Sequence, residues 1–418
     1  MRQGRLPGQL IIQLTDRCNA TCPQCGMNIN ERFPRRRLST DDVKRMIDAA
    51  GAQGVEAISF TGGEPLMVLK DLVALIHHAG AAGIKYIRTG TNGFLFRSPG
   101  KPDFSDRVHR LAETLAATPL RNFWISIDSA DPQTHESMRG FPGVIRGIER
   151  ALPIFQAYGL YPSANLGINR NLSGKQGIPV LRHSPGDAME MAAADFRERL
   201  VSGFTNFFRF AADLGFSIAN VCYPMSIETQ PGDDLDAVYA ATATSSIVSF
   251  SVQEKALLFD ALGQAVLKSR SRLRIFSPLC AIASLKGQFS EGKYGPACHG
   301  GRDFFFVDAV KGHTYPCGYR GGEDLGPFWQ RAELPDNSPD CHACEWECFR
   351  DPSELGGPLL ALATRPFKCL RRWAHDAELT QAWLKDLLYY RDCDYFNGRL
   401  PMRPSRLQRY ARPGSARN

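Results

Sequence analysis

The stretch LTDRCNATCPQCG, residues 14–26, places Cys18, Cys22 and Cys25 within eight residues, directly after the first apolar run of the chain at 10–14. A four-iron cluster normally takes four cysteine thiolates. Three closely spaced cysteines with no obvious fourth nearby would leave one iron open to a small molecule. Structural zinc is the alternative, because zinc also binds cysteine-rich loops and is usually completed by four protein ligands. The spacing alone leaves both interpretations open.

The next segment of the chain favours the cluster. Val55 to Phe60 is expected to form a buried strand, which runs directly into Thr61-Gly62-Gly63-Glu64-Pro65. Glycines at a strand end let the backbone approach a ligand closely. Glu64 adds a carboxylate suited to an ammonium group. We therefore expect a ligand that carries an ammonium group at this strand end.

Together these two motifs resemble the radical SAM superfamily, in which Cys-x3-Cys-x2-Cys follows a first strand and Gly-Gly-Glu-Pro follows a second. By that resemblance the three cysteines ligate a [4Fe-4S] cluster, and the amine and carboxylate of S-adenosylmethionine chelate its fourth iron. Gly62, Gly63 and Glu64 would hold the methionine ammonium. The residue before the third cysteine is usually aromatic or His in that family, whereas here it is Gln24. Gln24 can hydrogen-bond adenine but cannot stack on it, so the departure concerns the adenine contact and not the cluster.

Length and composition fit an enzyme of this kind. The 418 residues would bury a large core and divide into two or more domains, and 43% hydrophobic with 22% charged residues is ordinary for a globular protein. The longest apolar runs, such as 72–76 and 304–307, are too short to span a membrane, and no signal peptide opens the chain. We therefore expect a cytoplasmic protein with no membrane partner. In that reducing compartment its 12 cysteines would bind metal rather than form disulfides.

The formal net charge of +7 comes largely from the end of the chain. Residues 399–418 contain no acid and six arginines, without which the net charge is +1. Proline and glycine in the same stretch predict a solvated, disordered tail rather than a nucleic-acid-binding arm. No RNA-binding aromatic motif favours nucleic acid as a partner. The arginines are Arg399, Arg403, Arg406, Arg409, Arg412 and Arg417.

Apolar runs and helical patterns alternate from residue 10 to about 225. Strands are expected at 10–14, 55–60, 86–89, 122–127, 163–168 and 217–223. The main helices are expected at 39–50, 69–82, 106–117, 142–158 and 188–214. This order predicts an α/β fold with a parallel sheet, a partial (β/α)6 TIM-type barrel whose function lies at the carboxyl ends of the strands.

Polar residues follow those strand ends. Ser126 and Asp128 are two apart, so in an extended strand they point to the same side and could reach ribose hydroxyls or the methionine carboxylate. Asn92 follows the third strand, and Arg139 lies in a Met-Arg-Gly turn after the fourth. In similar enzymes such groups bind the nucleoside, which implies that role for Asn92, Ser126 and Asp128. Each could instead cap a helix or form a turn.

A second group of cysteines lies beyond residue 275. Residues 304–317 predict two short strands about a glycine turn, which present cysteines at both ends of a hairpin. The order of Cys298, Gly312, Cys317 and the Cys341-x2-Cys344 pair resembles the SPASM and twitch extensions of radical SAM enzymes, which hold auxiliary iron–sulfur clusters. We expect one or two such clusters, although zinc suits the same thiolates. The candidate ligands are Cys280, Cys298, Cys317, Cys341, Cys344, Cys348 and Cys369.

The expected organisation is therefore a barrel followed by a small Cys-rich SPASM/twitch-like α+β domain. The segments are a radical SAM partial barrel at 1–225, a connecting segment at 226–279, the auxiliary-cluster domain at 280–370, a helical segment at 371–398 and the basic tail at 399–418. Residues 230–250 either shape the substrate mouth or form a plain connection.

The resemblance implies the chemistry more closely than the substrate. An external donor such as flavodoxin or ferredoxin would supply an electron that cleaves S-adenosylmethionine, and the 5′-deoxyadenosyl radical would remove a hydrogen atom from the substrate. Auxiliary clusters would accept an electron from the product radical or ligate the substrate, which favours oxidation or a crosslink. Cys222, at the end of the sixth strand, could instead donate a hydrogen atom in an epimerisation. The alternative for Cys222 is a buried core cysteine.

Three classes of function remain open. Many SPASM enzymes that modify ribosomal peptides carry a leader-binding domain ahead of the barrel, whereas here about ten residues precede the first strand. This favours a small natural-product intermediate, such as a sugar or amino-acid derivative, over a peptide substrate. A noncatalytic zinc or iron–sulfur scaffold would keep the later cysteines but has no use for Gly62-Gly63-Glu64 at a strand end.

Overall fold

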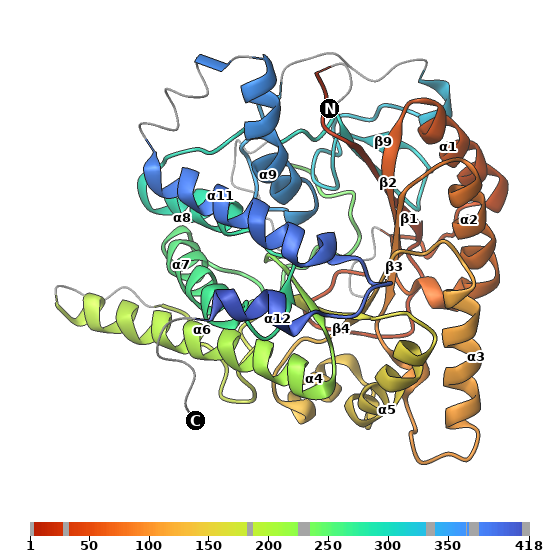
Figure 1. Ribbon diagram of the computed structural model, residues 1–418, viewed down its shortest axis with the longest axis horizontal. Helices are drawn as coiled ribbons and strands as arrows, with labels where there is room; N and C mark the ends of the chain where they lie inside the picture. Colours follow the sequence, from red (N-terminus) through yellow and green to blue (C-terminus); the bar gives the residue numbers. More distant parts are fainter. Residues whose placement is uncertain are drawn as a thin grey trace.

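Six parallel strands in sequence order form the centre of the protein in the computed structural model (Figure 1). They are β1 Gly8–Thr15, β2 Val55–Gly62, β3 Tyr86–Thr91, β4 Asn122–Ser126, β5 Ser163–Gly167 and β6 Ile218–Cys222. All six lie within a few residues of the expected strands. The structure describes residues 4–27, 33–181, 187–224, 235–331, 339–364, 366–367 and 376–411.

The sheet extends past both ends of this six-stranded unit. Its order is β7-β6-β5-β4-β3-β2-β1-β8-β9. β7 (Arg274–Ile275) and β8 (Phe304–Val307) pair in parallel with β6 and β1, and β9 (Thr314–Tyr315) pairs antiparallel with β8. The hairpin expected within 304–317 is confirmed, and it continues the barrel sheet. In the described part of the chain the sheet stays open between β7 and β9, as a partial barrel requires.

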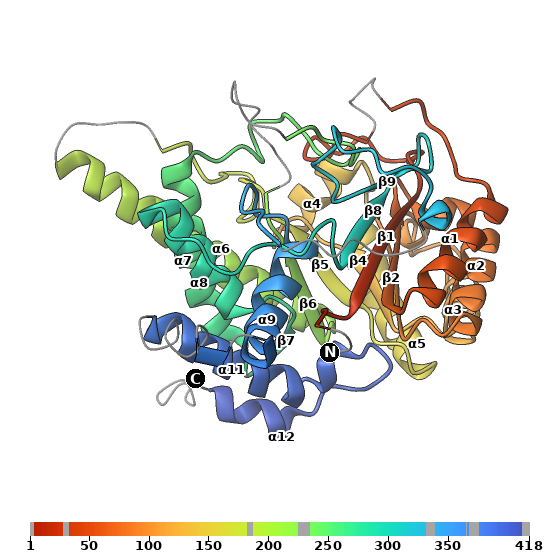
Figure 2. The same cartoon turned by 90° about the horizontal axis from the view of Figure 1, so that it is seen from above.

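Helices follow the strands and cover the outside of the sheet, with α1, α2 and α3 side by side on one flank and α6, α7 and α8 on the other (Figures 1 and 2). The helix expected at 39–50 begins after Ser39, whose side chain accepts a hydrogen bond from the Asp42 backbone. The short helix α4 was not expected. The helices are α1 Thr40–Ala52, α2 Leu69–Ala81, α3 Phe104–Ala116, α4 Pro132–Arg139, α5 Val144–Ala157, α6 Asp187–Leu214, α7 Val252–Ser269, α8 Leu279–Glu291, α9 Glu347–Thr364, α11 Ala377–Asp392 and α12 Pro404–Leu407.

Both faces of the first strand are buried. Leu10, Ile12 and Leu14 point outward into the core beneath the helices, whereas Ile11 packs with Phe304 and Phe306 in a second cluster. This alternation gives every strand an outer face for the helices and an inner face for the barrel interior. The inner face is therefore where a substrate would meet the chain. No helix in the described ranges is long and apolar enough to cross a membrane.

The expectation of a disordered tail from residue 399 is wrong as far as residue 411. Arg399 donates four hydrogen bonds to backbone carbonyls around the end of α3, and Arg406 pairs with Asp394 at 3.0 Å. The physical reason is that helix ends leave carbonyls without intrahelical partners, and a guanidinium can satisfy several at once. Arg412 and Arg417 lie outside the described residues.

Candidate functional site

The loop after β1 carries the three cysteines to the carboxyl end of the sheet. The Cys25 backbone donates to the Cys22 carbonyl at 3.1 Å, so the two thiols lie on one tight turn. Burial raises the pKa of Cys22 to about 11 and that of Cys25 to about 12, and the neighbouring cysteine thiols add to both shifts. Thiols held this close in a buried loop favour their neutral form until a metal centre takes the proton's place.

No three His, Cys, Asp or Glu side chains within the described ranges are arranged so that they could hold a single metal ion. The three thiols nevertheless lie near enough to shift one another's pKa. A four-iron cluster spreads its thiolates more widely than zinc does, because each thiolate binds a different iron. The spacing of the loop is therefore compatible with a cluster.

The glycines after β2 lie directly against the cysteine loop. A Cβ on Gly63 would lie 1.9 Å from the Arg17 carbonyl oxygen and 3.0 Å from the Cys18 Cβ. The Gly63 and Glu64 backbones donate to the Thr15 and Arg17 carbonyls at 2.7 and 2.9 Å. Only glycine fits this approach, so the two motifs seen in the sequence form one site.

Glu64 organises the loops rather than reaching outward. It is fully buried, and its two carboxylate oxygens accept hydrogen bonds from the Leu66 backbone at 3.0 Å and the Asn92 backbone at 2.6 Å. Burial raises its pKa to about 7. Gly62 and Gly63 keep part of their surface exposed, so their backbone is more accessible than the buried Glu64 carboxylate, which holds the neighbouring loops in place.

Asn92 also contacts the cysteine loop. Its amide nitrogen donates to the Asn19 side chain at 2.8 Å and to the Cys18 sulfur at 3.6 Å, and its side-chain oxygen accepts from the Phe94 backbone at 3.0 Å. Asn92 thus joins the end of β3 to the first cysteine. The sequence indicated its place at a strand end, but not this contact.

Asp128 lies beyond the end of β4 and pairs with Arg139 of α4. The guanidinium donates to the two carboxylate oxygens at 2.6 and 2.8 Å. Although burial pushes the pKa of Asp128 up, the Arg139 charge lowers it overall. Arg139 also acts electrostatically on Cys22 and Cys25, which places a cation beside the cysteine loop. The Met-Arg-Gly turn was the sequence signal for Arg139, but nothing in the sequence showed this ion pair.

Gln24, between the second and third cysteines, is 7% exposed, and its side-chain amide lies close enough to Asp128 to lower the pKa of that carboxyl. Ser126, on the partly exposed inner face of β4, is paired in register with Asn165 of β5. Both residues fit a polar nucleotide that lies over the strand ends.

The described part of the segment expected at the substrate mouth packs on the cysteine loop. The Gly26 backbone donates to the Ala241 carbonyl at 3.1 Å, and a Cβ on Gly26 would lie 2.0 Å from the Thr242 oxygen. Ala240 and Ala241 share an apolar cluster with Met27. Residues 235–250 thus cover the loop from the side of the later cysteines, and residues 230–234 lie outside the described ranges.

Four of the later cysteines meet around one small pocket: Cys298, Cys317, Cys341 and Cys344. The Cys298 backbone donates to the Cys341 carbonyl at 2.8 Å. The Gly300 and Tyr319 backbones donate to the Cys298 and Cys317 sulfurs, each at 3.4 Å. Backbone N–H groups directed at cysteine sulfurs stabilise their thiolates, as in iron–sulfur sites.

The other candidate ligands lie elsewhere. Cys348 donates to Glu347 at 3.3 Å and faces Cys222, which lies beside the same Glu347. Cys280 is buried in α8, where its backbone donates to Asp386 at 2.8 Å. Neither Cys280 nor Cys348 lines the four-thiol pocket. Cys369 lies outside the described residues.

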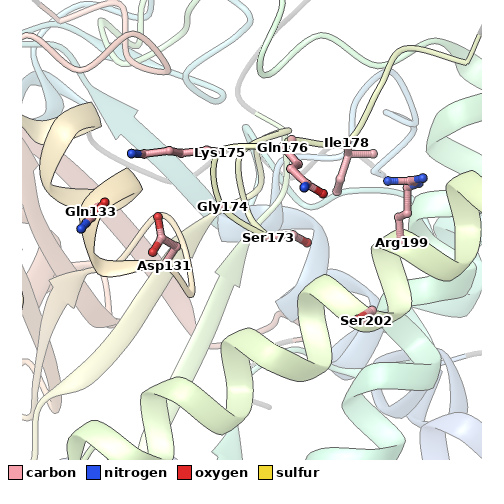
Figure 3. A pocket seen from close by; sticks show the side chains of 10 residues that line it. Asp131, Gln133, Ser173, Gly174, Lys175, Gln176, Ile178, Arg199 and Ser202 are labelled. Atoms are coloured by element: carbon pink, nitrogen blue, oxygen red, sulfur yellow. The ribbon is translucent and has the colours of Figure 1, made fainter.

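A larger hollow of about 460 Å³ opens between the start of α4, the loop at 173–178 and α6 (Figure 3). Lys175 and Arg199 lie on opposite sides of it. Asp131 caps α4 through the Thr134 backbone at 2.9 Å, and Arg199 pairs with Asp195 at 2.7 Å. None of its lining residues was predicted as a site residue, and these two charged groups already have partners.

Comparison with known proteins identifies the barrel. The radical SAM superfamily matches residues 12–168. An AdoMet-dependent heme synthase from Methanosarcina barkeri is 26% identical over 84% of this chain and 87% of its own length. A GTP 3′,8-cyclase from Mannheimia succiniciproducens is 32% identical over 35% of this chain and 41% of its own length. The structure of Streptococcus suis SuiB bound to S-adenosylmethionine superposes with a TM-score of 0.49 and 16% identity, covering 79% of this chain and 65% of that one.

The matched residues contain both sequence motifs, β1 to β5 and the close contact between Gly63 and the cysteine loop. The resemblance inferred from the motifs is therefore confirmed. Residues 12–168 therefore form a radical SAM domain, and enzymes of that superfamily use a [4Fe-4S] cluster and S-adenosylmethionine.

Proposed function

We propose that this enzyme oxidises or epimerises a small natural-product intermediate, a sugar or amino-acid derivative, inside the barrel. When bound, the [4Fe-4S] cluster and S-adenosylmethionine supply the radical chemistry that removes a hydrogen atom from an unactivated C–H bond. An external donor such as flavodoxin or ferredoxin supplies the electron. The protein's part is to bind, orient and shield the reacting groups.

The residues around the cysteine loop suit this cofactor pair. Cys18, Cys22 and Cys25 would hold the cluster, and the Gly62 and Gly63 backbone would receive the methionine ammonium. The buried amide of Gln24, beside Asp128, suits the adenine edge. The side chains at the following strand ends would orient the nucleoside. Asn92 is hydrogen-bonded to Asn19 and Asp128 to Arg139, and Ser126 lies on the inner wall of β4.

A polar inner wall is the observation that carries the proposal. The polar inward-facing side chains of β2 to β6 are amides, hydroxyls, a guanidinium and a thiol, and most keep some exposed surface although protein surrounds them. Apolar residues line the inner face of β1 and β8, where Ile11 packs with Phe306. A uniformly apolar interior would be expected if the barrel were only structural. The wall therefore suits a small polar molecule. Its members are Ser59, Arg88, Ser126, Asn165, Asn220 and Cys222.

Cys222 is our candidate hydrogen-atom donor. Its thiol lies on the inner wall at the end of β6 and donates to the Asn165 side chain at 3.4 Å. Burial raises its pKa well above the usual value, so the sulfur keeps its hydrogen at neutral pH. A protonated thiol at this place could give a hydrogen atom to a substrate radical, as an epimerase requires. An electron from the external donor and a proton from solvent would then restore the thiol.

The four-thiol pocket is the proposed auxiliary centre. Cys298, Cys317, Cys341 and Cys344 would supply a complete ligand set for one cluster. Zinc, the alternative, fits less well, because no three described ligand side chains are arranged around a single metal ion. A second cluster would need Cys280, Cys348 or Cys369, and the structure brings neither of the first two to this pocket. An auxiliary cluster so near the barrel would accept an electron from a product radical or ligate the substrate.

A peptide substrate is the second candidate, and a noncatalytic scaffold the third. The heme synthase relative, aligned over 84% of this chain, is named for a small-molecule product, which supports the first proposal over the peptide. A noncatalytic scaffold would not require Gly63 to pack so closely against the cysteine loop.

Anaerobic reconstitution of the full chain tests this function. We expect about four iron atoms per chain at the first site and about four more at the second, with matching sulfide. Under a strong reductant, S-adenosylmethionine should give 5′-deoxyadenosine, and Cys18→Ala, Cys22→Ala and Cys25→Ala should each abolish it. Zinc at the first site, or no turnover of the nucleotide, would contradict the proposal. Cys222→Ala should keep deoxyadenosine formation but lose incorporation of solvent deuterium into an epimerised product.

A further inference from the structure

Arg88 of β3 is the cation of the inner wall, and the mechanism above gives it no role. The strand register sets its backbone opposite Ser59 of β2 and Asn122 of β4, and its side chain points to the interior. Its Nε donates to the Ser59 hydroxyl at 3.0 Å. One neutral hydroxyl therefore fixes the plane of the guanidinium without matching its charge.

The charge on Arg88 lacks a close anion. Among the described residues, none of the ion pairs within 4.0 Å includes the partly buried Arg88, whereas Arg139, Arg170, Arg270 and Arg350 each have one. Burial lowers its pKa, while Cys348, Glu347 and Cys222 act in the opposite direction from a greater distance. Moving a guanidinium out of water without a counter-ion is costly. The inner wall therefore lacks a nearby negative charge that would balance the guanidinium of Arg88.

The groups that face Arg88 do not supply that charge fully. Cys222, Cys348 and Glu347 act on Arg88 only from beyond ion-pair distance. The Glu347 carboxylate instead accepts a hydrogen bond from the Cys348 thiol at 3.3 Å. Glu347 lies toward the same space, where a second full negative charge would be repelled.

We propose that Arg88 binds a carboxylate of the substrate and thereby orients the substrate against Cys222. This deepens the proposed function and rests on it, because it assumes that the barrel interior receives the substrate. The planar guanidinium, held by Ser59 through Nε, keeps its terminal nitrogens for a two-point contact with a planar monoanion. A phosphate dianion fits less well, since Glu347 and a single arginine leave it incompletely neutralised.

Binding of simple probes to the reconstituted full chain with S-adenosylmethionine tests this assignment. We would titrate hexanoate, with hexanamide as the uncharged isostere and hexyl phosphate as the dianion, and measure affinity by thermal shift and calorimetry. Hexanoate should bind the wild type at least tenfold more tightly than either alternative. Arg88→Met should lose this preference, Arg88→Lys should weaken binding severalfold, and Ser59→Ala should have a smaller effect.

Arg209→Met, on the exposed side of α6, is the matched control and should change nothing. Deoxyadenosine formation by the wild type without substrate separates the two proposals, because its absence would contradict the proposed function instead. Equal binding of hexanoate to wild type and Arg88→Met, or none to the wild type, would overturn the role of Arg88. So would equal or tighter binding of hexanamide or hexyl phosphate. If Arg88→Met does not fold, the affinity of Arg88→Lys for hexanoate, compared with that of the wild type, tests the role of Arg88.

Discussion

At the scale of single residues, Gly63 shows how a short motif builds the site. Its backbone lies so near the Arg17 carbonyl that no side chain fits, and its N–H bonds the Thr15 carbonyl at 2.7 Å. The cysteine loop and the β2 end are therefore one unit. The position of Cys18 therefore depends on residue 63 having no Cβ.

Gly63→Ala should displace the cysteine loop, because the new Cβ would lie 1.9 Å from a backbone oxygen that cannot turn away. We expect the variant to fold but to lose most of the iron of the first site and its deoxyadenosine formation. Iron analysis and circular dichroism check this. Gly100→Ala is the control, since nothing lies within 4 Å of its Cβ position. Full iron content in Gly63→Ala would contradict the geometry.

His135 gives a pH dependence at the same scale. It is fully buried, its Nδ1 accepts the Asp128 backbone N–H at 3.0 Å, and burial lowers its pKa from 6.5 to about 4. The unfolded chain therefore binds more protons between these values, so the free energy of unfolding falls as the pH drops from about 6.5 to about 4. The loss from this group should reach roughly 3 kcal/mol.

Urea unfolding at a series of pH values measures that slope. His135→Asn keeps an acceptor for the Asp128 backbone and should flatten the dependence in this window. His109→Asn, on the exposed side of α3, should leave it unchanged. An unaltered slope in His135→Asn would assign the effect to other groups.

At the scale of elements, the start of α7 is joined to the loop after β5. Ser251 and Glu254 form a capping box, and the Glu254 carboxylate also accepts from Arg170 at 2.9 Å and from the Leu181 backbone at 2.8 Å. Glu254 and Arg170 are 1% and 7% exposed. The Glu254 carboxylate thus caps the start of α7 and also neutralises Arg170, which lies in the loop after β5.

Ser251→Ala and Glu254→Ala should therefore differ in cost. Ser251→Ala removes one capping bond and should lower the free energy of unfolding by about 1 kcal/mol. Glu254→Ala leaves Arg170 without its buried counter-charge and should cost about 3 to 5 kcal/mol. Chemical denaturation of both variants gives the comparison, and similar losses would show that the Arg170 pair adds little.

At the scale of the whole molecule, the end of the chain closes the bottom of the barrel. The Tyr161 backbone donates to the Gly398 carbonyl at 2.7 Å, and Arg399 reaches the carbonyls of Leu115, Ala116, Thr118 and Leu120. Asp386 of α11 bonds Arg270 of α7 at 2.5 Å and the Cys280 backbone at 2.8 Å. Residues near 400 thus stabilise elements near 120 and 160.

Arg399→Ala should destabilise the fold by about 2 kcal/mol or more, because it removes several charge-assisted hydrogen bonds to backbone carbonyls around the end of α3. Arg403→Ala is the comparison. Arg403 is 45% exposed and pairs with Asp394 at 3.5 Å, so its loss should cost under about 1 kcal/mol. Thermal unfolding measures both, and equal melting temperatures would show that the chain end contributes little.

Local sequence determined much of this protein. Hydrophobic runs and caps are local signals, so the six strands and the helices at 40–52 and 69–81 were predictable, and the helix at 144–157 began within two residues of its expected start. The cysteine loop and Gly62-Gly63-Glu64 were also visible, because their chemistry depends on spacing along a few residues. The superfamily followed from these motifs, and comparison confirmed it.

Only the tertiary structure decided which distant residues meet. Glu64 became a buried support for Asn92, and Cys348 faced Cys222 while Cys341 and Cys344 joined Cys298 and Cys317. The arginines of the chain end found partners at helix ends and aspartates that composition could not reveal. The physical reason is that strand register, helix phase and the openness of the barrel set these contacts, and none of the three is a property of any one segment.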